Sequence, residues 1–267
     1  MEQIDVHNII NKFIEEKGYK ENEHVLGVYF YGSYQLGCAD EKSDIDVHVI
    51  FDDDNPKHIN RGNYFIDGLR VEFFEKPLKE MYLIAMHEQK NQNNALLAIA
   101  GNSEIIFDRN GELLEFKEYV KEIFSKPLKP MTIDQTKELI LMINNQMDEL
   151  EKLAYNCDPF CKHVYHITLE MIRKFYHRVI GAAVIPSPKV ARIYTDEYYR
   201  NLINKGIIPE QQFIDKYLDY VINDNVDFYQ LITNAKDLFS YSRRNIEFDD
   251  KANCCVPIES INERVRR

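Results

Sequence analysis

The chain has 267 residues, a formal net charge of −11 and 45% hydrophobic residues, which suffices for one large or two modest folded domains. No apolar run approaches the ~20 residues that span a bilayer, and no basic stripe offers the cations that a nucleic-acid backbone requires. These properties argue against a membrane-spanning protein and against long nucleic acids as partners. The five cysteines are an odd, sparse set, and the first ten residues carry acids where a signal peptide needs bases, so we expect a cytoplasmic protein.

Residues 1–126 mix helical and strand patterns. Residues 44–51 alternate between apolar and polar side chains, as expected of a strand with one buried and one polar face. The dipeptide Asp67-Gly68 stands between two apolar runs, which predicts a two-residue hairpin. In chain order we expect a helix from about Ile4 to Lys17, strands at 25–31, 44–51, 64–66 and 69–74, helices at 77–89 and 94–100, a strand at 104–107 and a helix that ends at Phe124.

The remaining sequence has the pattern of helices. Lys126–Pro130 has the composition of a linker, and residues 132–135 (TIDQ) form a capping box that predicts a long helix to about Tyr155. Further helices are expected at 160–183, 197–205, 210–222 and 226–244. The fold class is therefore α+β followed by a C-terminal helical bundle, with domains at residues 1–126 and 131–246 and an extended tail at 247–267.

A short segment contains the residues that most clearly indicate chemistry: Gly32-Ser33 and, ten residues later, Asp44-Ile45-Asp46. Because strand side chains alternate between faces, Asp44 and Asp46 project from the same side of the sheet. Two adjacent carboxylates repel unless cations lie between them, and Mg²⁺ prefers carboxylate and phosphate oxygens. The Gly-Ser turn, at the start of a following helix, offers backbone N–H groups to a phosphate. The segment therefore predicts a site for a metal and a nucleoside triphosphate.

Glu72 is the candidate for a third carboxylate. It lies on the strand after the hairpin, and a position beside the strand of Asp44 and Asp46 would bring it next to them. Two alternatives stay open: the aspartates could belong to a solvated strand face, and Glu72 could pair with Arg70 or a lysine. His48 shares the face of the aspartates, and we interpret it as a polar residue at a strand end.

These residues resemble the nucleotidyltransferase domain of the DNA polymerase β superfamily. The resemblance covers about residues 25–76 and depends on Gly-Ser, ten intervening residues, Asp-x-Asp and a carboxylate on a following strand. It is strongest toward the small bacterial aminoglycoside, lincosamide and minimal nucleotidyltransferases, several of which also append a helical domain. The resemblance implies a polymerase β-like mixed sheet with flanking helices.

The resemblance also implies roles for the motif residues. Asp44 and Asp46 would bridge two Mg²⁺ ions, and Glu72 would complete the ion nearest the acceptor. Gly32 and Ser33 would hold the β- and γ-phosphates of the triphosphate. The reaction requires positioning and charge neutralisation rather than covalent catalysis.

The base and the phosphate-binding cations are less restricted by the sequence. In the aminoglycoside enzymes that this chain resembles, the base comes from the helical domain. Asp148, Glu149 and Glu151 lie on the long predicted helix, and Glu149 is our choice among them. The candidate phosphate-binding cations are Lys42 in the motif loop, Lys189 after Pro186-Ser187-Pro188, and Arg192.

The sequence thus predicts a Mg²⁺-dependent enzyme that transfers a nucleoside monophosphate from a triphosphate such as ATP to a hydroxyl of a small molecule. The acceptor could be an antibiotic, and the acidic net charge favours a neutral or cationic molecule. Two alternatives stay open: nucleotidylation of a partner protein, as by an antitoxin, and a catalytically inactive nucleotide-binding protein. Some proteins that the chain resembles build the active site across a dimer, so a homodimer is compatible with the prediction.

Overall fold

The computed structural model describes residues 5–52, 60–90, 95–126, 128, 131–203 and 207–246. Its contacts divide the chain into two compact units, Met1–Leu128 with Arg192–Lys205, and Lys129–Ala191 with Gly206–Arg267. The sequence analysis placed the segment from Arg192 in the helical domain, whereas the structure groups it with the first unit. The predicted extended tail at 247–267 lies outside the described residues.

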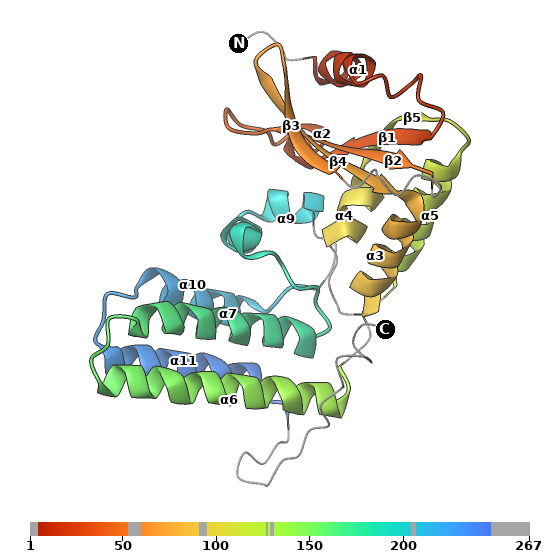
Figure 1. The fold of residues 1–267 in the computed structure, drawn as a ribbon. Helices are drawn as coiled ribbons and strands as arrows, with labels where there is room; N and C mark the ends of the chain where they lie inside the picture. The colour runs from red at the N-terminus through yellow and green to blue at the C-terminus, as the bar shows by residue number, and fades with distance from the viewer. Residues whose placement is uncertain are drawn as a thin grey trace. The chain divides into compact units, whose positions relative to one another are not determined.

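A mixed five-stranded sheet forms the centre of the first unit (Figure 1). The strands are β1 (Val25–Tyr31), β2 (Ile45–Phe51), β3 (Asn60–Ile66), β4 (Leu69–Pro77) and β5 (Glu104–Asp108), in the spatial order β3-β4-β2-β1-β5. β2 and β4 are parallel, and the other neighbouring pairs are antiparallel. The parallel pair matters for the site because it places β4, the second strand of the β3–β4 hairpin, directly beside β2.

Helices cover both faces of this sheet (Figure 1). On one face, the apolar side of α1 (Val6–Glu16) packs against side chains such as Val47 and Val71. On the other face, a second apolar cluster joins the sheet to α3 (Leu78–Lys90), α4 (Ala95–Asn102) and α5 (Glu112–Phe124). Side chains alternate between the two faces along β2, so Val47 and Val49 pack on the face of α1, and Asp46 and His48 project from the opposite face.

The predicted hairpin is confirmed. Asp67 and Gly68 have φ angles of 49° and 81°, and they connect β3 to β4 between the paired residues Ile66 and Leu69. Two successive positive φ angles are those of the turn type that matches the right-handed twist of a hairpin, which explains the Asp-Gly sequence. This turn fixes the register of β3 against β4.

The second unit consists of helices. α6 (Ile133–Tyr155) begins with the predicted capping box, in which the Thr132 and Gln135 side chains each accept a hydrogen bond from the other residue's backbone N–H. The apolar faces of α6, α7 (Cys161–Val179), α10 (Gln211–Ile222) and α11 (Phe228–Ser242) pack together. Within the described residues, no helix is both long and apolar enough to cross a membrane.

The chain between α7 and α10 contains short helices. A 3₁₀ turn, η1 (Ser187–Lys189), leads into α8 (Val190–Thr195), and α9 (Glu197–Ile203) follows. The sequence predicts no helix between residues 183 and 197, whereas the structure has η1 and α8 there. Pro188 is compatible with the start of a helix because the first N–H groups have no helical acceptor. With this correction, the α+β fold with a C-terminal helical region is confirmed.

Candidate active site

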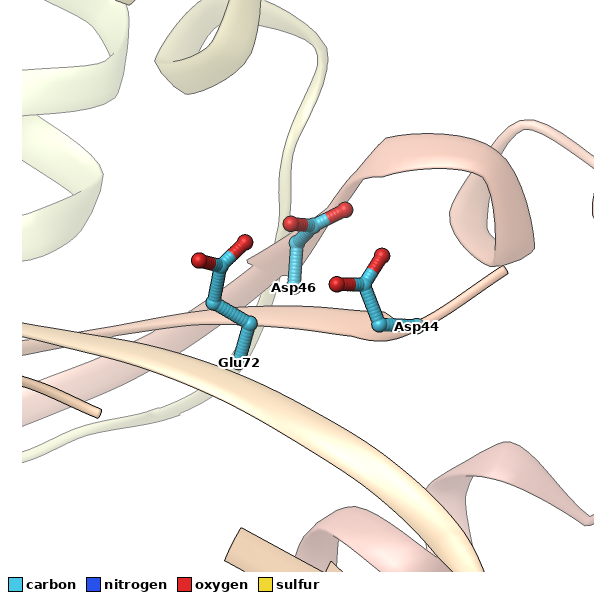
Figure 2. A group of neighbouring side chains, drawn as sticks. All are labelled: Asp44, Asp46 and Glu72. Carbon is cyan, nitrogen blue, oxygen red and sulfur yellow. The ribbon is translucent and has the colours of Figure 1, made fainter. Parts of the chain in front are cut away.

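The register of the sheet brings three carboxylates together. Asp46 on β2 and Glu72 on β4 are direct partners in the parallel ladder. Asp44 stands two residues before Asp46, at the entry to β2, and so projects from the same face. One oxygen from each of the three carboxylates lies within 4.8 Å of the others, and Figure 2 shows the three groups on the same side of their strands.

Gly32 is fitted closely to this cluster. It begins α2 (Gly32–Gln35) immediately after β1, and the preceding Tyr31 is the register partner of Asp46. The φ angle of Gly32 is 84°, and a Cβ atom there would lie 2.1 Å from Asp46 Oδ2. Glycine is therefore required twice, by the backbone conformation and by the approach of the carboxylate. The N–H groups of Gly32 and Ser33 belong to the first turn of α2, where a helix supplies no acceptor.

An aromatic layer continues the face of the sheet that carries the carboxylates, since His48 and Phe74 lie two residues after Asp46 and Glu72 on β2 and β4. His48 is 6% exposed, stacks on Tyr31 at 5.0 Å between ring centroids, and contacts Tyr29 and Phe74. Burial lowers the pKa of His48 to about 3, and the charge of Lys76 adds to the effect, so the ring is neutral at pH 7. The interpretation of His48 as a strand-end residue is wrong, because β2 continues to Phe51 and rings from the neighbouring strands β1 and β4 pack against His48.

Tyr31 connects the aromatic layer to the carboxylates. Burial raises the pKa of its phenol, and the charges of Asp46 and Glu72 raise it further. The phenol is thus protonated at pH 7 and close enough to sense the charge of the carboxylates. Sequence reasoning did not select Tyr31, although its position directly before Gly32 was a usable signal.

Two arginines pair with the carboxylates. Arg61 on β3 donates from Nε and Nη2 to Glu72 Oε1 at 3.1 and 2.6 Å. Arg70 on β4 donates from Nη2 to Asp44 Oδ2 at 2.8 Å. The sequence analysis considered Arg70 as a partner of Glu72, whereas the structure pairs it with Asp44 and gives Glu72 to Arg61.

The loop between α2 and β2 is organised by Asp40. Its carboxylate accepts hydrogen bonds from the Lys42 N–H at 2.9 Å and from Ser43 Oγ at 3.1 Å. The Lys42 N–H makes the largest contribution to lowering the pKa of Asp40, and the charge of Arg192 contributes as well. Lys42 itself is exposed in this loop. Arg192 also stacks over the Tyr199 ring at 3.9 Å from its centroid, a contact within the returning segment.

The other two predicted site residues belong to the second unit. Glu149 on α6 has a side chain that is 53% exposed and lies 3.6 Å from the ammonium group of Lys152. Lys189 ends η1 and is exposed. Their roles at the reaction centre therefore remain predictions.

The donor set of the cluster suits Mg²⁺. Among the described residues, Asp44, Asp46 and Glu72 are the group of side chains whose ligand atoms are close enough to hold a metal ion. All donors are carboxylate oxygens, which hard cations prefer over the nitrogen and sulfur ligands of zinc sites. Because Gly32 has no side chain, the Asp46 carboxylate has room beside the start of α2.

Comparisons with known proteins agree with this geometry. The family model of the nucleotidyltransferase domain matches residues 8–152, more than half of the chain. The chain therefore belongs to the polymerase β-like nucleotidyltransferase family, and its general activity is nucleotidyl transfer. The matched range includes the Gly-Ser turn and all three carboxylates.

Two individual proteins are similar to this chain, each over a different share of its length. A protein from Methanocaldococcus jannaschii, whose name proposes protein adenylyltransferase activity, is 28% identical over 142 residues, which cover 52% of this chain and 95% of that protein. A solved nucleotidyltransferase-like protein from Exiguobacterium sibiricum is 13% identical with a TM-score of 0.48, and the match covers 90% of this chain and 75% of that one.

Proposed function

We propose that this protein catalyses the transfer of a nucleoside monophosphate from a nucleoside triphosphate to a hydroxyl group, with Mg²⁺ held by Asp44, Asp46 and Glu72. The observation that carries the proposal is the convergence of three carboxylate oxygens within 4.8 Å beside the start of α2. Bound Mg²⁺, as two ions, would neutralise the charge that collects on the phosphates during the transfer.

The protein's own groups would position the triphosphate. The N–H groups of Gly32 and Ser33 lie in the first turn of α2 and have no acceptor within the helix. They are therefore suited to bind β- and γ-phosphate oxygens. Lys42 on the adjoining loop would add a positive charge, and Arg192, which acts electrostatically on Asp40 in that loop, is a second candidate. Lys189 stays a proposed contact from the second unit.

In the reaction, the acceptor oxygen forms a bond to the α-phosphorus while the bond from that phosphorus to the bridging oxygen of the β-phosphate breaks. The electron pair of the broken bond leaves with pyrophosphate. The hydroxyl proton passes to a base, for which we propose Glu149 as an exposed carboxylate of α6. The transfer needs no covalent intermediate with the protein.

Two classes of acceptor have support. The name of the M. jannaschii relative favours a protein hydroxyl, such as that of tyrosine or serine. The net charge of −11 favours a neutral or cationic small molecule over a polyanion. We place the protein acceptor first, because the relative matches over nearly its whole length.

The test uses purified protein with Mg²⁺ and ATP, GTP, CTP or UTP labelled at the α-phosphate. Label that enters a protein band of a cell extract indicates a protein acceptor, and label on small molecules separated by chromatography indicates the other class. The double variant Asp44→Asn/Asp46→Asn is the control for each transfer. The proposal fails if this variant transfers label as fast as the wild type.

A catalytically inactive nucleotide-binding protein is the remaining alternative. It predicts triphosphate binding by calorimetry without pyrophosphate release for any acceptor. Pyrophosphate release that disappears in Glu72→Gln would contradict it.

A further inference from the structure

The arginines at the carboxylate cluster differ in environment from the acids they contact. The Arg61 and Arg70 side chains are 69% and 48% exposed, whereas the Glu72 and Asp44 side chains are 20% and 23% exposed. Ion pairs with such exposed partners contribute little to folding stability because water and salt screen them. Folding stability therefore does not account for the presence of Arg61 or Arg70 at these positions.

Their hydrogen bonds lie where a metal ion would bind. Both contacts of Arg61 end on one oxygen, Glu72 Oε1, and the contact of Arg70 ends on Asp44 Oδ2. A carboxylate has a limited number of lone pairs, and a guanidinium group repels a divalent cation at the same oxygen. Arginine and metal ion are therefore competitors for these acids.

Both arginines are also placed to contact a phosphate. They come from β3, which is an edge strand of the sheet, and from β4, the neighbouring strand that also carries Glu72. The Arg61 guanidinium lies 4.9 Å from the centroid of the Phe74 ring, which supports it without using its N–H donors. The planar fork of arginine fits phosphate oxygens as well as carboxylate oxygens.

We propose that Arg61 and Arg70 are exchangeable counter-ions of this site: divalent cations displace them from Glu72 and Asp44, and they then bind the triphosphate that enters with the metal. The exchange keeps Asp44 and Glu72 paired at every stage, which reduces the repulsion among the three carboxylates within 4.8 Å. The inference rests on the proposed function: the competition depends on its metal site, and the triphosphate part depends on its substrate as well.

The test compares metal binding and triphosphate binding in one set of variants. Mn²⁺ binding is measured by electron paramagnetic resonance of the free ion, without nucleotide. Binding of a non-hydrolysable ATP analogue with Mg²⁺ is measured by calorimetry. The variants are the wild type, Arg61→Gln/Arg70→Gln and Lys121→Gln/Lys126→Gln. The lysine pair removes two charges from exposed ion pairs with Glu118 and Glu122 in the same unit.

The two affinities should change in opposite directions. The arginine double variant should bind Mn²⁺ about tenfold more tightly and the analogue about tenfold more weakly, because it loses a competitor in one case and a ligand in the other. The lysine control should stay within about twofold of the wild type in both measurements.

Wild-type or weaker Mn²⁺ affinity in the arginine variant would overturn the inference, and so would an equal gain in the lysine control. Wild-type affinity for the analogue would overturn the triphosphate part. A failure of the proposed function looks different: the wild type would then bind no Mn²⁺, or Asp46→Asn would bind it equally well.

Discussion

Arginine–carboxylate pairs occur in both units, but in contrasting surroundings. At the candidate active site the arginines are exposed and the acids are partly buried. On α7 the relation is reversed: the Arg173 side chain is 0% exposed and its partner Glu170 is 21% exposed. The guanidinium–carboxylate pairs therefore differ between the candidate active site and α7 in how far water reaches the arginine.

The network on α7 is built into the fold. Arg173 donates to both oxygens of Glu170 and to the Ile185 carbonyl, and Ser187 and Tyr217 also donate to Glu170. Burial raises the pKa of Glu170, but the hydrogen bond and charge of Arg173 outweigh it and lower the pKa to about 2. The acid thus stays ionised and fastens the chain after α7 to the helix.

The comparison contrasts a pair with a buried arginine with pairs whose arginines are exposed. A buried arginine cannot leave its acid without a large desolvation cost, whereas an exposed arginine can turn to another anion at little cost. Substitutions at the candidate site should therefore alter activity, whereas substitutions in the buried network should alter stability.

The largest effect is expected from Glu72→Gln. It should reduce nucleotidyl transfer about a thousandfold, because one of the three proposed metal ligands becomes neutral, and leave the unfolding midpoint nearly unchanged. Transfer is measured with α-labelled triphosphate and unfolding by circular dichroism. Glu118→Gln on α5 is the control and should keep wild-type activity. If the transfer activity of Glu72→Gln stays within tenfold of the wild type, Glu72 is not part of the active site.

Arg173→Met should destabilise the second unit by about 3–5 kcal/mol, because it leaves Glu170 without its buried partner. Arg70→Met should change the unfolding free energy very little, since its guanidinium is already in contact with water. Urea unfolding of both variants measures the difference. Equal destabilisation would contradict the contrast between the regions.

Gly32→Ala should reduce transfer about a hundredfold, because the new Cβ atom would occupy the space of Asp46 Oδ2. Gly37 is the matched control, since its φ angle is also positive, at 68°, and an added Cβ would meet no atom within 4 Å. Gly37→Ala should therefore lose only about 1 kcal/mol of stability from backbone strain. Equal activity of the two variants would show that displacement of the carboxylate is unimportant.

The smallest effect concerns His177 beside the buried network. Burial and the charge of Arg173 lower its pKa to about 4, although the Ala183 carbonyl opposes the shift. At pH values between about 4 and 6.5, His177 binds a proton in the unfolded chain but not in the folded chain. Stability should therefore fall as the pH falls through this window, by at most about 1.4 kcal/mol per pH unit from this residue.

The variant His177→Gln should flatten that pH dependence in urea unfolding. His163→Gln, an exposed histidine on the same helix, should leave the dependence unchanged. If His177→Gln retains the full slope, another group is responsible for it.

Much of the fold follows from local patterns in the chain. The alternation of residues 44–51, the Asp67-Gly68 turn and the capping box at Thr132 are short-range signals, and each corresponds to an observed element. Strand periodicity also placed Asp44 and Asp46 on one face, because the side-chain period of a strand is two. These features depend only on residues near one another in sequence.

The errors and omissions concern long-range contacts. His48 was interpreted as a strand-end residue, but Tyr31 and Phe74 from neighbouring strands bury it. The pair of Arg61 with Glu72 depends on the register of β3 against β4, which the motif does not contain. The grouping of Arg192 with the first unit depends on contacts with residues more than 150 positions away, such as Asp40.

The sequence by itself therefore determined which residues form the candidate site: the glycine, and two acids that strand periodicity places on one face. The tertiary structure decided which charges face those acids. Asp46 and Glu72 meet because β2 and β4 are parallel neighbours, and the partners of Asp44 and Glu72 were decided by strand pairing. Side-chain chemistry is a local property, but an ion pair requires that packing bring distant residues to within a few ångströms.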